Sequence, residues 1–271
     1  MGAGALAMND TDPIYLDYNA TTPVLPEVVD AMLPYLRDHF GNPSSGHVYG
    51  QRARQAVARA REQVAALVGC EPDEVIFTSG GTEANNLAIR GVTDARDDRR
   101  HVVTTLIEHP ATARPCDWLE KHGWRVSRVG VDAQGCARVD EAAKAVGADT
   151  ALVTVMHSNN ETGVIQPVEE LARLAHAVGA LAHTDAAQSL GKVRVNVREL
   201  DVDLLSMAGH KLYAPKGVGA LYVKRGTPLL PFVLGAGHER GLRPGTENVA
   251  FIAGPGGAGE AMGRALEALG C

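Results

Sequence analysis

The sequence predicts an α/β fold in which a mostly parallel sheet is covered by helices on both faces. Short, almost continuously apolar segments alternate with longer segments of helical periodicity, and turn-forming residues separate them. Strands of a parallel sheet are buried on both faces and therefore read as uninterrupted apolar runs. The chain has 271 residues, of which 45% are hydrophobic, so it is long enough for one sizeable core.

The first part of the chain is expected to be mainly helical. Residues 1–12 are predicted to be flexible, and residues 13–17 to form a short strand. A proline opens a predicted helix over residues 26–39. Residues 51–68 form the clearest helix, because apolar residues recur on one face and Gly69 can end it.

From residue 75 onward, strands and helices alternate. The predicted strands are residues 75–78, 101–106, 124–129, 151–156, 180–183, 204–206 and 219–223. The predicted helices are residues 80–89, 111–122, 140–146, 168–178 and 257–269. No further element follows the last helix, so we expect an interrupted chain. Residues 13–256 would then form one large domain, and residues 257–271 the start of another.

Composition and charge disfavour several classes of function. The net charge is −6 and no basic stripe follows a predicted helix, so nucleic acid is not an expected partner. No apolar run approaches the length that spans a membrane, and residues 1–7 lack the features of a signal peptide. The four cysteines show neither CxxC pairing nor metal-ligand spacing, which favours a reducing, cytoplasmic setting: Cys70, Cys116, Cys136 and Cys271.

Lys211 is the central candidate for chemistry. It follows the predicted strand 204–206 and lies in a loop of small residues, which lets a bulky ligand approach the backbone. A lysine withdrawn from water has a lowered pKa and can act as an amine nucleophile. The alternative is an ordinary surface lysine, which is the commoner case for any single lysine.

Other polar residues fall at strand ends, where ligands of open α/β sheets bind. Gly81 and Thr82 lie between a strand and a helix, so their N–H groups and the hydroxyl suit a phosphate; the alternative is a common helix start. Asp185 could pair with a pyridinium nitrogen or simply cap the following helix. Gln188, three residues further on, can reach a ring oxygen.

Two further loops add candidate residues. His109 could stack on a cofactor ring and move protons near neutral pH, although a single loop histidine is usually structural. Asn160 offers an amide donor for a ring oxygen or a substrate carboxylate, with a turn motif as the alternative. A metal site is disfavoured, because no pair among the candidate ligands has suitable spacing: His109, His183, Asp185 and His210.

Seven motifs occur in order along the chain: YLDYNATTP (15–23), GNPSS (41–45), TSGGTE (78–83), NNETG (159–163), HTDAAQ (183–188), GHK (209–211) and RPGTEN (243–248). Together they resemble the cysteine desulfurases and selenocysteine lyases of the class V aminotransferase group. The resemblance covers the chain from residue 15 to about residue 263. It implies a pyridoxal 5′-phosphate enzyme of fold type I, whose large domain has a mostly parallel, seven-stranded-type sheet, and a homodimer with sites at the subunit interface.

The resemblance also implies roles around the cofactor ring. Lys211 would hold the cofactor covalently and move a proton from the substrate's α-carbon, and His109 would stack on the ring. Asp185 would pair with the pyridine nitrogen and Gln188 with the ring hydroxyl. Asn160 would lie near the ring oxygen and the substrate carboxylate.

At the phosphate end, the resemblance implies contacts from Thr82 and His210, and from Thr246 to the phosphate of the other subunit. Lys192 and Lys216 are rivals of the cofactor-holding lysine, but neither follows the Gly-His pair.

The implied reaction takes sulfur or selenium from L-cysteine or L-selenocysteine and leaves L-alanine. In the desulfurases a cysteine thiolate becomes a persulfide, which supplies a sulfur-acceptor protein for iron–sulfur clusters or thio-cofactors. The alternatives are a selenocysteine lyase or another carbon–sulfur lyase, and a non-catalytic dimeric scaffold.

The sequence departs from the family pattern in two places. Ala208 stands where many desulfurases carry a phosphate-binding serine, a feature closer to the selenocysteine lyases. The family's catalytic cysteine and most of its small C-terminal domain would lie beyond residue 271. None of the four cysteines matches the catalytic position, so we expect impaired activity in this form.

Overall fold

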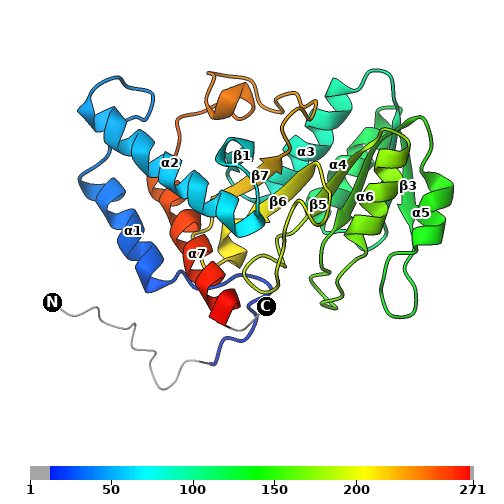
Figure 1. Ribbon diagram of the computed structural model, residues 1–271, viewed down its shortest axis with the longest axis horizontal. Coiled ribbons are helices and arrows are strands. Elements are labelled where there is room, and N and C mark those ends of the chain that lie inside the picture. Colours follow the sequence, from blue (N-terminus) through cyan, green and yellow to red (C-terminus); the bar gives the residue numbers. More distant parts are fainter. Residues whose placement is uncertain (1–12, 269–271) are drawn as a thin grey trace.

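The computed structural model describes residues 13–268, without side-chain detail after residue 263, and shows a seven-stranded sheet flanked by helices (Figure 1). The strand order is β1-β7-β6-β5-β4-β2-β3. The strands are β1 Val75–Thr78, β2 His101–Thr105, β3 Arg125–Val129, β4 Thr150–Met156, β5 Leu181–Asp185, β6 Leu204–Ala208 and β7 Gly219–Val223. Only β7 runs antiparallel to its neighbours among these strands, so the predicted mostly parallel sheet is confirmed.

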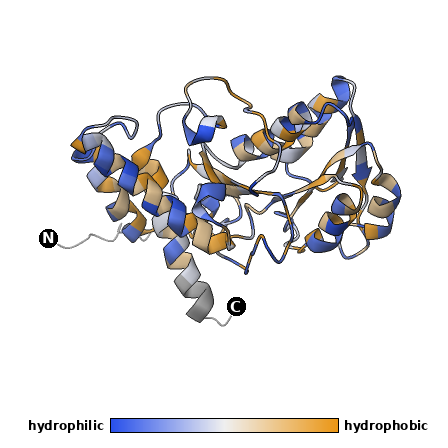
Figure 2. Ribbon diagram, turned by 45° about the horizontal axis from the view of Figure 1, so that its top comes forward, coloured by the Kyte–Doolittle hydropathy of each residue, from blue (hydrophilic) through white to orange (hydrophobic). Residues whose placement is uncertain are grey.

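Helices cover both faces of the sheet. They are α1 Pro26–Arg37, α2 Val48–Val68, α3 Gly81–Ala95, α4 Pro110–Lys121, α5 Val139–Ala145, α6 Val168–Ala177 and α7 Val249–Ala268. Helices α3 and α4 pack with one set of alternate strand residues, and the other helices pack with the opposite set. Most residues of β1, β4, β6 and β7 are therefore apolar, whereas β2, β3 and β5 also carry several polar residues, so the sheet contains both hydrophobic and hydrophilic segments (Figure 2). No described helix is long and apolar enough to cross a membrane.

Two predictions of secondary structure are wrong. Residues 13–17 form no strand, and Ile14 and Leu16 are 80% and 83% exposed, because this segment pairs with no described strand. The last helix, α7, begins at Val249 rather than at residue 257. Its glycines do not end it; they let it pack closely, since a Cβ on Gly256 would lie 2.8 Å from the Cα of Ala60.

The boundary that we place between residues 256 and 257 lies inside α7. The division into a large domain and a second domain therefore stays a prediction. The segment expected to be flexible, residues 1–12, and the last cysteine, Cys271, both lie outside the described residues.

A long irregular segment after β7 is fastened to the sheet by an ion pair. The side chain of Glu239 is 2% exposed, and its carboxylate accepts hydrogen bonds from Arg61 Nη1 at 2.8 Å and Nη2 at 2.6 Å. It also accepts one from the Phe77 N–H at 2.8 Å. Glu239 therefore ties residues 224–248 to α2 and β1, next to the helix start at Gly81.

Replacement of Arg61 by methionine should destabilise the protein markedly. The variant keeps the volume but leaves the Glu239 carboxylate buried with only one backbone donor, so the free energy of unfolding should fall by about 3 kcal/mol. Urea unfolding followed by circular dichroism measures this loss. Arg59→Met, on the exposed side of the same helix, is the control and should cost less than about 0.5 kcal/mol. Equal losses in the two variants would contradict the role given to the ion pair.

Candidate active site

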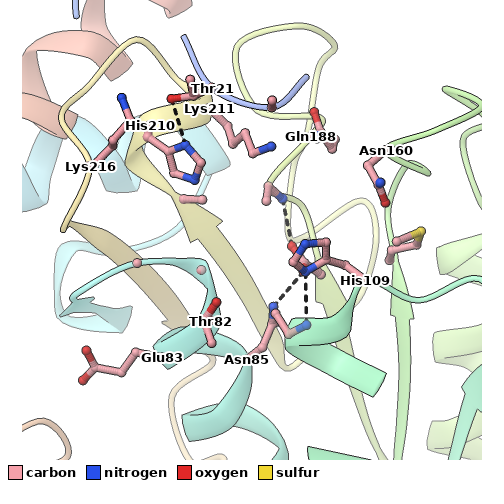
Figure 3. Close-up of a pocket in the computed structure, with 18 of the residues that line it drawn as sticks. Thr21, Thr82, Glu83, Asn85, His109, Asn160, Gln188, His210, Lys211 and Lys216 are labelled. Carbon is pink, nitrogen blue, oxygen red and sulfur yellow. Dashed lines mark hydrogen bonds between the residues drawn. The ribbon is translucent and has the colours of Figure 1, made fainter. Parts of the chain in front are cut away.

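A cavity of about 670 Å³ opens at the carboxyl ends of the parallel strands (Figure 3). The structure brings most of the predicted site residues to its wall: Gly81, Thr82, His109, Asn160, Asp185, Gln188, His210 and Lys211. Thr246 does not line it. Parallel pairing places Asp185 beside Met156 and Ser206 in neighbouring strands, and the turns that follow these strands supply much of the wall.

Asp185 ends β5 and is buried at the base of the cavity. One carboxylate oxygen accepts from the Ala187 N–H at 3.0 Å, and the other from Asn85 Nδ2 at 2.7 Å. Burial raises the pKa of Asp185, although these hydrogen bonds and the charges of His109 and Lys211 act in the opposite direction. Asp185 forms no ion pair within the described residues, so a cationic ring nitrogen in the cavity would be a suitable partner.

Lys211 ends the short 3₁₀ turn Gly209–Lys211 that follows β6. Its ammonium donates to the backbone carbonyl of Asn19, so the N-terminal segment lies against the lysine. Burial lowers the pKa of Lys211, while Asp17 and Asp185 act to raise it. A larger share of the amine is therefore unprotonated near neutral pH than for an exposed lysine, as nucleophilic chemistry requires.

Another part of the cavity wall is formed by the first turn of α3. The leading N–H groups of a helix have no intrahelical acceptor, and Gly81 and Thr82 present theirs at the cavity wall. A Cβ on Gly81 would lie 3.2 Å from the Cβ of Ala208. A Cβ on Gly219 would lie only 2.7 Å from the backbone of Gly80, so small residues hold this turn in place.

The side chains of Glu83 and Arg243 set the charge beside the first turn of α3. The Glu83 carboxylate accepts from the Ser79 N–H at 2.6 Å and from Arg243 Nε at 2.9 Å. Burial acts to raise the pKa of Glu83, but these two partners outweigh it and hold the pKa below its usual value. Since Arg243 balances this carboxylate, the helix start keeps the positive end that suits a phosphate. His210, from the other side, hydrogen-bonds through Nδ1 with the Thr21 hydroxyl at 3.2 Å.

His109 is held by the start of α4 and by its neighbour Glu108. Its Nδ1 accepts from the Ala111 N–H at 3.1 Å, so the orientation of the ring is set from the helix (Figure 3). The Glu108 carboxylate is partly buried and accepts from the Met156 N–H at 3.1 Å and from the Thr105 hydroxyl at 2.6 Å. Glu108 thereby joins the loop that carries His109 to the end of β4.

Sequence reasoning missed several residues of the site. Asn85 is fully buried and supports Asp185, and its position on the apolar face of α3 is a signal that could have revealed it. Asn19 acts mainly through its backbone carbonyl, which has no sequence signature. Thr21 also lines the cavity, as does Lys216, which the sequence indicated only as a rival of Lys211. The described residues contain no cluster of three or more potential metal ligands.

The family model for aminotransferase class V matches residues 14–265 of this chain. Similar curated proteins include "Cysteine desulfurase IscS" of Dictyoglomus turgidum (strain DSM 6724 / Z-1310), 49% identical, and "Cysteine desulfurase NifS" of Azotobacter vinelandii, 47% identical. Each alignment covers 94% of this chain and 63% of the relative. The chain thus spans less than two thirds of the length of these relatives.

Solved structures show the same architecture. A "NIFS-like protein" superposes with a TM-score of 0.91 at 40% identity, over 94% of this chain and 71% of that one. The structure titled "SspA in complex with cysteine" superposes with a TM-score of 0.88 at 40% identity, over 91% of this chain and 72% of that one. The predicted fold class is therefore confirmed.

Glu108 should make the stability of the protein depend on pH. Burial raises its pKa to about 8, and the charge of Asp185 adds to the increase. Between its usual pKa of about 4.3 and this value, the folded protein holds a proton that the unfolded chain has lost, so stability falls as pH rises. The contribution is at most about 1.4 kcal/mol per pH unit.

Urea unfolding across this pH range should therefore show a shallower decline for Glu108→Gln than for the unaltered chain. Asp185 contributes in the same direction in both proteins, so only the difference between them reports on Glu108. Glu62→Gln, on the exposed side of α2, is the matched control and should follow the unaltered chain. Parallel curves for Glu108→Gln and the unaltered chain would show that the buried carboxyl does not titrate in this way.

Proposed function

The chain belongs to the class V aminotransferase family, and on that premise we propose that it is the cofactor-binding part of a cysteine desulfurase. The enzyme would use pyridoxal 5′-phosphate to release sulfur from L-cysteine, leaving L-alanine. The observation that carries the proposal is the convergence of a buried carboxylate, Asp185, and an amine of lowered pKa, Lys211, on one cavity. The chain spans 63% of the length of the two relatives named above, so the activity of the whole protein is part of the proposal.

The residues present fit this cofactor. The N–H groups of Gly81 and Thr82 and the ring of His210 form a phosphate-binding end. Asp185 lacks a cationic partner among the described residues, as expected of a carboxylate that pairs with a pyridinium nitrogen. The amine of Lys211 lies in the same cavity, where it would hold the cofactor's aldehyde carbon (Figure 3).

The bound cofactor supplies an electron sink for the charge that develops at the substrate's α-carbon. The chain's own residues do the rest. The Asp185 carboxylate favours the protonated ring nitrogen, and Gln188 donates to the ring oxygen. Lys211 removes and returns the α-proton, His109 stacks on the ring and moves protons, and the Asn160 amide binds the substrate carboxylate.

The thiolate that accepts the sulfur is proposed to come from outside the described residues. None of the cysteines within residues 13–268, namely Cys70, Cys116 and Cys136, lines the cavity. Burial raises the pKa of Cys70 and of Cys116 to about 12, so both are neutral thiols near pH 7 and poor nucleophiles.

Other parts of the proposal rest on the sequence resemblance. They are a homodimer in which Thr246 reaches the phosphate of the partner's cofactor, a sulfur-acceptor protein, and a cytoplasmic location. Selenocysteine is the alternative substrate, and one residue favours it. Ala208 lines the cavity and offers no hydroxyl to a phosphate, a feature that is closer to the selenocysteine lyases.

The covalent role of Lys211 can be tested directly. With pyridoxal phosphate the unaltered chain should develop a visible absorption band, and borohydride reduction followed by peptide mapping should label Lys211. Lys211→Ala should lose both the band and the label, because Lys216, the other lysine that lines the cavity, is not expected to take over its role. Lys144→Ala, an exposed lysine on α5, is the control and should keep both. Label on another lysine in the unaltered chain would overturn the assignment.

The phosphate end can be tested through the close contact at Gly219. A methyl group there would lie 2.5 Å from the Met207 carbonyl oxygen of β6 and 2.7 Å from the backbone of Gly80, so it would displace the turn that precedes α3. Overpacking of this kind costs about 1–3 kcal/mol, and cofactor binding would have to restore the displaced turn at that cost. Gly219→Ala should therefore bind pyridoxal phosphate about 10-fold or more weakly. Gly46→Ala is the matched control, because nothing lies within 4 Å of the added methyl group, and it should bind normally. Equal affinities would argue against the phosphate lying at this turn.

A further inference from the structure

Lys192 lies in the turn region after β5 and contacts a wall of the cavity without lining it. Its ammonium donates to Gln188 Oε1 at 2.8 Å and lies 3.5 Å from Asn19 Oδ1. The proposed function assigns this lysine no role. Its contact with Gln188, which does line the cavity, therefore calls for a physical explanation.

Two neighbours set the direction of the Gln188 side-chain amide. An ammonium can only donate and a carbonyl oxygen can only accept, so Lys192 must face the amide oxygen. The amide nitrogen, Nε2, donates to the Asn19 carbonyl at 2.9 Å. Each amide nitrogen carries two hydrogens, so Nε2 keeps a second donor for a ligand in the cavity. The reverse orientation would direct the amide nitrogen at an ammonium and the amide oxygen at a carbonyl.

We infer that Lys192 is a positioning residue, which holds the Gln188 amide so that a donor faces the ring oxygen of the bound cofactor. The inference rests on the proposed function, because it needs a ring oxygen beside Gln188. Without Lys192 only the Asn19 carbonyl would hold the amide. In its reversed orientation the amide would direct an acceptor at an electron-rich oxygen. Lys192 thus acts through Gln188 and does not need to contact the cofactor itself.

Several charged groups surround this pair and influence any titration measured at the cofactor. Lys211, from the turn after β6, acts on Lys192, and Asp17 and Asp185 act in turn on Lys211. The other titratable groups of the cavity wall include His109, His210 and Lys216. Burial lowers the pKa of Lys192, and the charge of Lys211 adds to the decrease. All variants at positions 188 and 192 share these surroundings, so differences between the variants isolate the contact.

A double-mutant cycle on the cofactor-loaded protein tests the inference. The measured quantity is the pH midpoint at which the visible band of bound pyridoxal phosphate changes. A donor at the ring oxygen favours the more negative, deprotonated state, so its loss should raise the midpoint. Lys192→Met and Gln188→Leu should each raise it by about one pH unit. The double variant should match Gln188→Leu alone, because the lysine acts through the glutamine.

Two further variants separate positioning from general damage. Lys192→Arg keeps a cationic donor and should restore the midpoint of the unaltered chain, whereas Lys144→Met on α5 should never move it. Additive shifts in the double variant, or an unchanged midpoint in Lys192→Met, would overturn the positioning role. If the unaltered chain forms no visible band, the proposed function itself fails. A band that is present but insensitive to position 192 leaves that function standing and removes only this inference.

Discussion

The buried Asp185 carboxylate is the group around which the rest of the site is arranged. A buried charge costs several kcal/mol unless it is paired or hydrogen-bonded, and the described residues provide only hydrogen bonds. Asn85 from α3 and the N–H of Ala187 supply them at 2.7 Å and 3.0 Å. The amine of Lys211 and the start of α3 face the same cavity, and the charge of Lys211 favours the ionised carboxylate without forming an ion pair with it. The carboxylate therefore suits the cationic ring nitrogen that the proposed function places beside it.

A row of neutral polar side chains supports this carboxylate from within the sheet. His183, two residues before Asp185 on β5, lies between the Thr154 hydroxyl at 2.7 Å and the Ser206 hydroxyl at 2.9 Å. Burial lowers the pKa of His183 to about 3, so the ring is neutral at physiological pH. The row cross-links β4, β5 and β6 without adding charge. These are the strands whose ends carry Asp185 and lead to Lys211, so the spacing of the two groups is set by a rigid, fully paired part of the core.

The sequence was sufficient for features that depend on local pattern and insufficient for those that depend on tertiary contact. Apolar runs placed β1 and β7 at their observed bounds, and the tendency of ligands to bind at strand ends correctly grouped Asp185, Gln188 and His109 around one cavity. The strand predicted at residues 13–17 is absent, because an apolar run forms a strand only where it can pair with a neighbouring strand. Asn85 and Lys192 were overlooked as supporting residues because their partners are fixed by helix packing and by amide direction, which no spacing rule encodes.

The N-terminal segment shows how such a tertiary contact serves the chemistry. Thr22 is bonded to the turn that holds Lys211, since its N–H donates to the His210 carbonyl at 3.0 Å and its hydroxyl accepts from the Tyr213 N–H at 2.9 Å. This fixes the Asn19 carbonyl where both Lys211 and Gln188 donate to it. When the lysine amine is drawn to a cofactor or a substrate, the carbonyl still has the glutamine as a donor and is not left unsatisfied. The lysine can therefore leave and return at low cost, which is what the proposed function asks of its amine.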